Sequence, residues 1–308
     1  MAISKKIKIL VTGGSGFLGE NLIEKLIPIS DRIYILDKSF KKNHNFTKKV
    51  IRIKSDLSNL KILKKNFQKI KKVDLVIHAA AVQPFGKDDS VEKYIKSNFI
   101  GSLNLLNACD KKNIKKFIIC SSFSVYGKPE KLPVREDHPQ QPQNIYGFSK
   151  MLAEKAFEFY HRQKNFKFII LRFDGIFGFG QNLPGFIKFA ISQIKYNKKF
   201  DVFSNGNQVR DHLYIDDAVQ SILNSIKILD KQKYKIINVS SGQPKKTKQL
   251  IKLISGLLKI DSRARYVKKK NPNFNYNTYM DISKMKKTLR LKPSNIKSSI
   301  LKMLNKDI

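Results

Sequence analysis

The chain has little cysteine and histidine, with two and five of them in 308 residues. Cys109 and Cys120 form no CxxC pair, and neither stands at ligand spacing from a histidine, which excludes the usual zinc sites. Because the histidines are dispersed, we predict no metal centre. One cysteine falls in an expected helix and the other in an expected buried strand, so we expect two reduced core residues.

Long apolar runs are also missing. No stretch approaches the roughly 20 residues that a membrane-spanning helix needs. The amino terminus leads almost directly into an expected strand, without the apolar region of a signal peptide. We therefore predict a cytoplasmic protein with no membrane partner.

Acidic residues are scarce: 24 Asp and Glu stand against 61 Lys and Arg, and the formal net charge is +37. Such a charge would by itself point to nucleic acid or an anionic surface. However, the basic residues are scattered and mostly lysine, and they accompany much Ile and Asn, which share A/T-rich codons with lysine. A biased genome accounts for this composition, so we predict no nucleic-acid partner. The charge could still attract anionic substrates.

What the sequence does have is a regular alternation of apolar strands and helical segments. The strands are expected at residues 8–11, 33–36, 50–53, 73–77, 117–120, 168–171 and 234–239. The helices between them are expected near residues 17–27, 58–70, 89–111 and 145–163. This order predicts an α/β fold of the Rossmann type, with a doubly wound parallel sheet.

Beyond Arg172 the alternation breaks. A glycine-rich loop at 175–180 precedes a run of expected helices, at 184–196, after Asp216, and at 246–259, 281–289 and 296–304. We predict a larger dinucleotide-binding domain from residues 1–172 and 207–240. A smaller substrate-binding lobe would comprise residues 173–206 and 241–308.

The most informative motif is the glycine run of residues 13–19, Gly-Gly-Ser-Gly-Phe-Leu-Gly, between the first strand and the first helix. Gly14, Gly16 and Gly19 match the dinucleotide fingerprint: one allows the turn, one lets the backbone approach a pyrophosphate, and one lets helix pack on strand. The amino terminus of the helix supplies N–H groups and a positive dipole. The alternative is a purely structural glycine turn.

Asp37 ends the second strand, eighteen positions after Gly19. Its carboxylate is expected to accept a hydrogen bond from a ribose 2′-hydroxyl, and it would repel a 2′-phosphate, so we predict NAD rather than NADP. Lys38 follows directly and could soften that repulsion. The alternative interpretation of Asp37 is a solvated strand end.

Tyr146 and Lys150 lie one helical turn apart, so both side chains emerge on the same helix face. A nearby ammonium favours the phenolate, and we expect Lys150 to lower the pKa of Tyr146 enough for it to act as a general base. Ser122 follows an expected parallel strand, where open α/β sheets place ligand-binding residues. By itself the Tyr–Lys spacing is common on surface helices; the fold and the serine favour the catalytic interpretation.

With these residues the chain resembles the extended short-chain dehydrogenase/reductase family, particularly its NAD-dependent nucleotide-sugar epimerases and reductases. The resemblance covers nearly the whole chain. It rests on residues 12–19, Asp56-Leu57, His78-Ala79-Ala80, Asn98, Ser122 before residues 125–127, Tyr146 with Lys150, Leu171-Arg172 and residues 210–217.

The resemblance implies a set of cofactor contacts: Gly13, Gly16, Phe17, Leu18, Gly19, Asp37, Asp56, Leu57, Ala79, Ala80, Asn98, Tyr146 and Lys150. Ser122 and Arg210 would bind a nucleotide-sugar substrate, with Arg210 on its diphosphate. Alternatives remain for three of them. Asp56 could be a helix cap, Asn98 could be structural, and Arg210 could pair with Asp211 or Asp217.

The resemblance implies an NAD-dependent epimerase, and our first hypothesis is one that acts at C4. The reaction would pass through a transient 4-keto sugar, with Tyr146 as general base. A reductase or dehydrogenase with the same Ser–Tyr–Lys set is the first alternative, and a non-catalytic dinucleotide sensor or RNA-binding protein is the second. No carboxylate stands in residues 122–124, which argues against 4,6-dehydration.

The chain departs from its relatives where a substrate would be recognised. Related enzymes usually have Asn at the position of Gly175 and Pro at the position of Phe179. Many 4-epimerases have an Arg near residues 271–273, for which Lys269 or Lys270 could substitute as a point charge.

The resemblance also implies a homodimer, formed by the helices at 89–111 and 145–163. The expected contacts are Leu103, Leu106, Phe157 and Tyr160. The alternative is that these side chains pack on the sheet.

Overall fold

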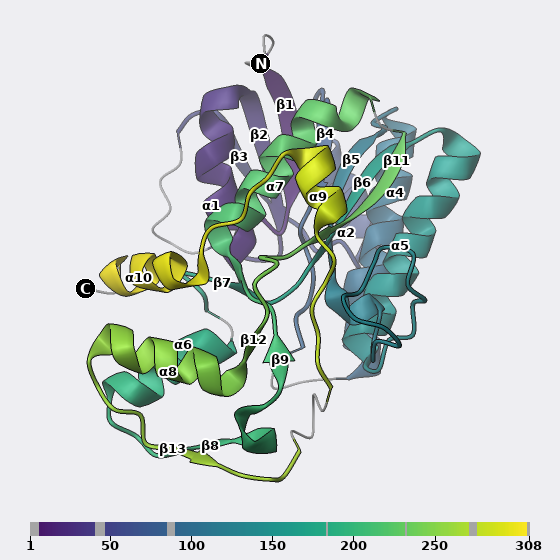
Figure 1. Cartoon of the computed structure of the whole chain (residues 1–308). Coiled ribbons are helices and arrows are strands. Elements are labelled where there is room, and N and C mark those ends of the chain that lie inside the picture. The colour runs from purple at the N-terminus through teal and green to yellow at the C-terminus, as the bar shows by residue number, and fades with distance from the viewer. Residues whose placement is uncertain are drawn as a thin grey trace. The chain divides into compact units, whose positions relative to one another are not determined.

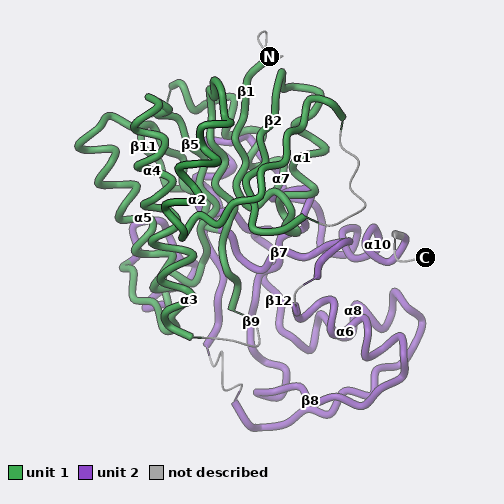
Figure 2. Tube along the Cα trace, turned by 180° about the vertical axis from the view of Figure 1, so that it is seen from behind, with its two compact units in different colours: residues 1–127, 139–172, 219–237 green, residues 128–138, 173–218, 238–308 purple. Residues whose placement is uncertain are grey.

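The computed structural model describes residues 6–40, 47–84, 90–182, 184–231, 233–270 and 276–306. The chain divides into two compact units, which Figure 2 colours separately. Unit 1 comprises residues 1–127, 139–172 and 219–237, and unit 2 comprises residues 128–138, 173–218 and 238–308. These units differ from the predicted domains mainly in segments 128–138 and 207–218, which both belong to unit 2. Which ligand each unit binds stays a prediction.

Unit 1 is built on a seven-stranded sheet with the strand order β3, β2, β1, β4, β5, β6, β11. The strands are β1 (Ile7–Thr12), β2 (Ser30–Asp37), β3 (Val50–Lys54), β4 (Leu75–His78), β5 (Lys116–Ser122), β6 (Lys167–Phe173) and β11 (Tyr234–Val239). β1 pairs in parallel with both β2 and β4, and the pairs β2–β3 and β4–β5 are parallel too. Every predicted strand is present, and the predicted Rossmann-type fold is confirmed.

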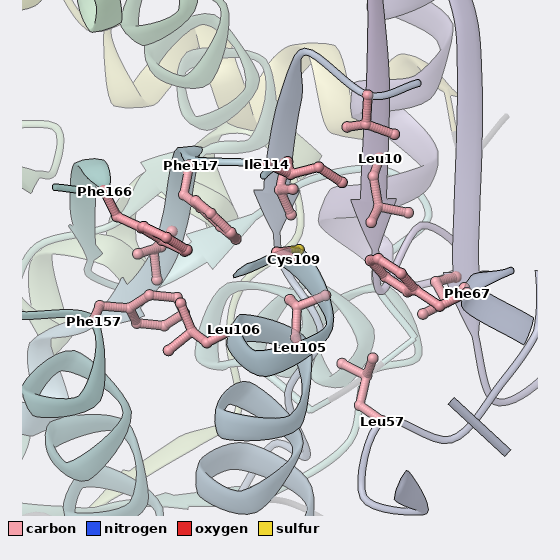
Figure 3. Packing of buried hydrophobic residues seen from close by; sticks show 14 of the residues in the cluster. Leu10, Leu57, Phe67, Leu105, Leu106, Cys109, Ile114, Phe117, Phe157 and Phe166 are labelled. Atoms are coloured by element: carbon pink, nitrogen blue, oxygen red, sulfur yellow. The ribbon is translucent and has the colours of Figure 1, made fainter. Parts of the chain in front are cut away.

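Helices cover both faces of this sheet. Successive side chains of a strand point to opposite faces, and because these strands are continuous apolar runs, both faces are apolar. Leu10 joins one core cluster together with side chains of α2 (Leu60–Phe67), α4 (Gly101–Lys111) and α5 (Ile145–Lys164), as Figure 3 shows for part of the cluster. α1 (Phe17–Leu26) lies on the opposite face (Figure 1). The order of the strands reverses at β1, so the segments after β1 and β4 flank the point where such sheets bind ligands.

The predicted helix at 89–111 is interrupted. It consists of α3 (Val91–Tyr94), the π-helical segment η2 (Ile95–Ile100) and α4. Single π-helical turns inside α-helices are frequent at functional sites. Asn98 is the buried residue of η2.

Unit 2 contains short strands that pair two by two. These pairs are β7 (Ile176–Phe177) with β10 (Leu213–Tyr214), β8 (Phe200–Val202) with β13 (Ala264–Tyr266), and β9 (Val209–Arg210) with β12 (Lys245–Lys246). The helices are α6 (Phe186–Lys195), α8 (Thr247–Leu258), α9 (Ser283–Leu289), α10 (Ile296–Lys306) and the start of α7 (Ile215–Ile228), which continues in unit 1. The helices were predicted, whereas the strands were not, because two or three residues are too few to show an alternation.

Both cysteines are free and buried, as predicted, and burial raises the pKa of each thiol. Two of the predicted dimer contacts are wrong. Leu106 and Phe157 are fully buried in the core cluster of unit 1, where they cannot meet a second subunit. Leu103 and Tyr160 are partly buried against the same cluster. Among the described residues, no helix is long and apolar enough to cross a membrane.

Candidate functional site

The glycine loop of unit 1 is packed so tightly that three of its positions exclude a side chain. Gly13 has φ +72°, and a Cβ there would lie 2.6 Å from the Cα of Ala80. A Cβ on Gly19 would lie 2.2 Å from the carbonyl oxygen of Gly13, and one on Gly14 would lie 2.5 Å from the Ile35 side chain. These contacts bring the start of α1 against the ends of β1 and β4.

The amino terminus of α1 is open toward this loop. Gly16 is the residue before the helix and has no side chain with which to cap the first N–H groups. Phe17 and Leu18 form the first turn. Uncapped N–H groups and the helix dipole together favour a phosphate at such a position. The residues present therefore fit the pyrophosphate of a dinucleotide.

Asp37 lies at the end of β2, beside the glycine loop. Its Oδ2 accepts a hydrogen bond from the backbone N–H of Ser15 at 2.9 Å, and its Oδ1 accepts one from the N–H of Lys38 at 2.7 Å. The carboxylate is thus fixed next to the loop, which does not match a freely solvated strand end. The lone pairs that remain on its oxygens suit ribose hydroxyls.

The ammonium of Lys38 binds groups other than Asp37. The Nζ of Lys38 lies 3.1 Å from the Oδ2 of Asp56 and donates to the hydroxyl of Ser97 at 3.2 Å. The carboxylate of Asp37 therefore keeps its repulsion toward a 2′-phosphate, which favours NAD.

Asp56 is not the cap of α2, so that alternative is wrong. The cap is Asn59, whose Oδ1 accepts from the N–H of Ile62 at 3.0 Å. Asp56 accepts instead from the N–H and hydroxyl of Ser58, at 2.8 and 2.7 Å. Burial works to raise the pKa of Asp56, but the hydrogen bonds of Ser58 and Lys38 hold it below its usual value. Its neighbour Leu57 belongs to the core cluster, so a contact of either residue with adenine stays a prediction.

Ala79 and Ala80 follow β4 and lie against the glycine loop. The N–H of Ala79 donates to the carbonyl of Thr12 at 3.1 Å, and the N–H of Ala80 donates to the Thr12 hydroxyl at 3.4 Å. The end of β4 is thereby tied to the end of β1. This is the place in the sheet at which we predicted the wall of the cofactor cleft.

The predicted Ser–Tyr–Lys set comes together in unit 1. Ser122 ends β5, and its hydroxyl and the Gln83 side chain both hydrogen-bond to Tyr146 on α5. Lys150 lies one turn further along α5 and donates from Nζ to the carbonyl of Cys120 at 2.7 Å. Cys120 and Ser122 are two residues apart on β5. Hence α5 directs both side chains to the same strand.

We predicted that Lys150 lowers the pKa of Tyr146, and for the protein without ligands this prediction is wrong. Burial raises the pKa of Tyr146, although the hydrogen bonds of Ser122 and Gln83 oppose it. Burial likewise lowers the pKa of Lys150. With exposed fractions of 6% and 4%, both groups are desolvated, and desolvation disfavours the charged form of each.

Asn98 fastens α5 to the segment after β4. Its Oδ1 accepts from the N–H of Val82 at 2.7 Å, and its Nδ2 donates to the carbonyl of Val82 at 3.2 Å and to the hydroxyl of Ser149 at 3.0 Å. Ser149 in turn donates to the carbonyl of Tyr146 at 2.7 Å. Both N–H donors of the amide are therefore used within the protein. This geometry favours the structural interpretation of Asn98.

A buried histidine links the same segments, and the sequence offered it only as part of a motif. The ring nitrogens of His78 lie 2.7 Å from the Thr12 hydroxyl and 2.9 Å from the Ser102 hydroxyl. Because Ser102 donates its own proton to the carbonyl of Asn98, it must accept from His78 Nε2–H. Burial and the charge of Lys150 lower the pKa of His78 to about 3. His78 is therefore a neutral structural link.

Sequence reasoning also missed a buried ion pair behind the tyrosine. Arg172 donates to both carboxylate oxygens of Glu154, with Nη2 2.6 Å from Oε2. The same carboxylate accepts from the hydroxyl of Ser121 and from the side-chain amide of Gln140. Glu154 lies one turn beyond Lys150 on α5, and Arg172 stood in the sequence as part of the motif Leu171-Arg172, with nothing to indicate that the two side chains meet. The pair connects α5 to β5 and β6.

Unit 2 contains Arg210, the predicted diphosphate ligand, on β9. Its Nη1 donates to the hydroxyl of Thr278 at 3.0 Å. The carboxylate of Asp211 is held by Ser241, by the N–H of Gly242 and by the N–H of His212. Asp217 accepts from the N–H and hydroxyl of Ser294. The two carboxylates considered as partners of Arg210 thus bind other groups.

The departures from the family pattern also lie in unit 2. Gly175 has φ +41°, and a Cβ there would lie 2.8 Å from the carbonyl oxygen of Asp211 and 3.1 Å from Nδ1 of His212. The imidazole of His212 therefore stands where a side chain on residue 175 would begin. Phe179 is 44% exposed. Lys269 and Lys270 are described, but residues 271–273 lie outside the described residues.

Comparison with known proteins agrees with this site. Residues 9–240 match the model of the NAD dependent epimerase/dehydratase family. A putative UDP-glucose 4-epimerase of Methanocaldococcus jannaschii is 32% identical over 96% of this chain and 97% of its own length. The chain is also similar to two solved structures. One is the UDP-glucose 4-epimerase of Thermotoga maritima with UDP-glucose, at 25% identity, a TM-score of 0.86, and coverage of 97% of this chain and 98% of that one.

The second structure is a UDP-N-acetylglucosamine 4-epimerase of Methanobrevibacter ruminantium with UDP-N-acetylmuramic acid. It is 26% identical, with a TM-score of 0.84 and coverage of 98% of both chains. The predicted resemblance is confirmed, and so is NAD as the cofactor of the family. The chain belongs to the NAD dependent epimerase/dehydratase family of enzymes, among the nucleotide-sugar 4-epimerases of the extended short-chain dehydrogenase/reductase type.

Proposed function

We propose that this chain is an NAD-dependent epimerase that inverts C4 of a UDP-hexose, interconverting UDP-glucose and UDP-galactose. The observation that carries the proposal is the hydrogen bond between Ser122 and Tyr146, with Lys150 one turn away in the same buried region. The relative that is 32% identical bears the name of this activity. Family membership alone would leave the reacting group open.

We assign NAD to the glycine loop and its surroundings. The N–H groups at the start of α1 would bind the pyrophosphate, Asp37 would accept from the ribose hydroxyls, and Ala79 and Ala80 would line the cofactor. The packing at Gly13 and Gly19 supports this, since the loop has room for backbone contacts only. NAD, when bound, supplies the acceptor for the hydride from C4 and returns it.

In the mechanism, the phenolate of Tyr146 would remove the proton of the C4 hydroxyl while C4 would lose its hydrogen as hydride, so that the C–O bond becomes a ketone. Ser122 holds the substrate oxygen by a hydrogen bond. The 4-keto sugar would turn over, and Tyr146 would give the proton back to the oxygen when hydride is returned to the other face of C4. The reaction is an isomerisation with no net oxidation.

Lys150 assists by its charge and by position. Burial raises the pKa of Tyr146, so loss of the phenolic proton needs a positive neighbour. Among the described residues Lys150 donates to the carbonyl of Cys120, which leaves two of its three N–H donors for other groups. We assign those donors to the nicotinamide ribose and to the charge formed on Tyr146.

Unit 2 would recognise the nucleotide sugar, with Arg210 on the diphosphate. Its guanidinium is planar and always charged, which suits paired phosphate oxygens. The carboxylates of Asp211 and Asp217 accept hydrogen bonds from other groups.

We also propose a homodimer through α5, now with different side chains. Phe148 and Phe159 on this helix are 41% and 56% exposed, and they replace the buried Leu106 and Phe157 as the contacts. Analytical ultracentrifugation of Phe159→Glu tests this: a dimer becomes a monomer, whereas an unchanged mass contradicts the contact. The cytoplasmic location stays a prediction.

The test of function is incubation of purified protein with UDP-, dTDP-, GDP- and CDP-sugars, followed by NMR. We expect UDP-glucose and UDP-galactose to interconvert without net NADH. Tyr146→Phe should lower kcat by about 10²–10⁴-fold. Tyr160→Phe on the same helix is the control, since it removes a phenol at the surface side of α5 and should leave kcat unchanged. Net NADH production would favour a reductase or dehydrogenase, and no turnover of any nucleotide sugar would refute the proposal.

A further inference from the structure

Five buried side-chain polar atoms of unit 2 lack a hydrogen-bond partner in the described part of the chain, and two of them lie beside Gly175. Asp174 directly follows β6, is 8% exposed, and its Oδ2 is unpartnered. The Nε2 atom of His212 is buried and unpartnered as well. Leaving a buried polar group unpaired destabilises the folded protein, so native proteins contain few such groups. Two within one short region call for an explanation.

The two groups lie on either side of Gly175. Asp174 precedes it in the chain, and Nδ1 of His212 lies 3.1 Å from the position of a Cβ on Gly175. The imidazole is held between two aromatic rings: it stacks on Phe186 at an interplanar angle of 26° and meets Phe177 edge-on at 88°. Its ring position is therefore fixed without a hydrogen bond to Nε2.

Burial favours the uncharged form of both groups. Burial and the negative charge of Asp211 raise the pKa of Asp174 to about 8, with Arg210 opposing them. Burial and the charge of Arg210 lower the pKa of His212 to about 4. A neutral carboxyl can donate and accept, and a neutral imidazole nitrogen does one or the other.

We propose that Asp174 and His212 form a hydrogen-bonding subsite for a hydroxyl group on the sugar of the nucleotide sugar whose diphosphate Arg210 binds. This inference rests on the proposed function. A hydroxyl both donates and accepts, so a single one can satisfy the two orphaned atoms. The subsite would thereby distinguish the sugar, whereas Arg210 recognises the diphosphate.

A hydroxyl fits this subsite better than a carboxylate, such as that of a hexuronic acid. Arg210 is the positive group that acts electrostatically on both Asp174 and His212. A bound diphosphate would neutralise its charge. The charge that remains near Asp174 is then the negative one of Asp211. A second anion would meet repulsion there.

The test measures the Kd of UDP and of UDP-glucose by calorimetry, with NAD present at saturation. Asp174→Leu and His212→Phe keep the approximate shapes and remove the polar atoms. We expect each substitution to raise the Kd of UDP-glucose about 3–10-fold, which corresponds to the loss of one hydrogen bond. The Kd of UDP should stay within twofold of the wild-type value. Asp174→Asn, which can still donate and accept, should restore most of the affinity. Asp216→Asn, an exposed carboxylate nearby in the sequence, is the control and should change neither Kd.

Each outcome decides the inference. Unchanged Kd values for both ligands in Asp174→Leu and His212→Phe would overturn it, as would an equal loss for UDP and UDP-glucose, which would indicate a nucleotide contact or a damaged fold. A wild-type protein that binds no UDP-glucose would overturn it too. A wild-type protein that binds UDP-glucose without epimerising it would refute the proposed function, while the ratio of the two Kd values would still decide the subsite.

Discussion

Arg172 and Asp174 are only two residues apart in the chain, yet their surroundings differ sharply. Arg172, in unit 1, pairs with Glu154, whose carboxylate also accepts from Ser121 and Gln140. Asp174, in unit 2, has an oxygen with no partner in the described part of the chain. The difference teaches that a buried polar side chain has two uses. A completed network holds elements together, whereas an incomplete one is left for a ligand.

Breaking the completed network should have the largest effect. Glu154→Leu removes the carboxylate and leaves the buried Arg172 uncompensated, so we expect the free energy of unfolding to fall by about 3–5 kcal/mol. Denaturant unfolding monitored by circular dichroism measures it. Glu158→Leu, on the same helix and at its surface, is the control and should change stability by less than about 1 kcal/mol. An equally small loss for Glu154→Leu would show that the two networks do not differ as described.

Asp174→Leu should raise the free energy of unfolding, whereas Glu154→Leu lowers it, and the size of the gain should depend on pH. Its folded pKa of about 8 exceeds the unfolded value of about 3.9, so between these values the folded protein keeps a proton that the unfolded chain has released. The wild type therefore loses stability at this site as pH rises from about 4 to 8. The groups that set this pKa besides burial are Asp211, Arg210 and the N–H of Gly175.

Unfolding free energies measured from pH 5 to 8 test this prediction. The advantage of Asp174→Leu over the wild type should grow with pH, whereas Asp216→Asn should follow the wild type. A difference that stays constant across this range would mean that Asp174 is ionised in the folded protein, and the contrast with Glu154 would lose its basis.

The smallest effect is expected for Lys38→Ala. Its partner Asp56 is about one-third exposed and the lysine about one-half, so the ion pair contributes less than about 1 kcal/mol. The preference for NAD over NADP should also stay the same, because the ammonium of Lys38 binds Asp56 rather than Asp37. Fluorescence titration with both cofactors measures this preference. A tenfold gain or loss in NADP affinity would restore Lys38 as a determinant of cofactor choice.

The sequence predicted the sheet well because buried parallel strands are apolar runs of four or more residues with helices between them. It predicted Tyr146 and Lys150 together because one helical turn separates them. The hydrogen bonds of Gln83, of Asn98 and between Arg172 and Glu154 join positions far apart in the chain, and spacing carries no information about them.

Two predictions failed because a pattern does not report burial. The spacing of Tyr146 and Lys150 indicated a tyrosine with a lowered pKa, but desolvation outweighs the hydrogen bonds that favour the phenolate. Leu106 and Phe157 lie on the helices implied for a dimer, but their side chains face the sheet. In unit 2 the strands are too short to show a periodic pattern in the sequence. The position of the His212 imidazole beside Gly175 depends on residues far apart in the chain and could not be predicted either.

The central claim is that hydride leaves C4 and returns to C4 of the same sugar. It is tested most directly with UDP-glucose that carries deuterium at C4, with the product analysed by NMR and mass spectrometry. We predict UDP-galactose that retains the deuterium at C4, with no lasting absorbance of NADH. Loss of the deuterium to water, or net NADH with a keto sugar as the final product, would contradict the mechanism.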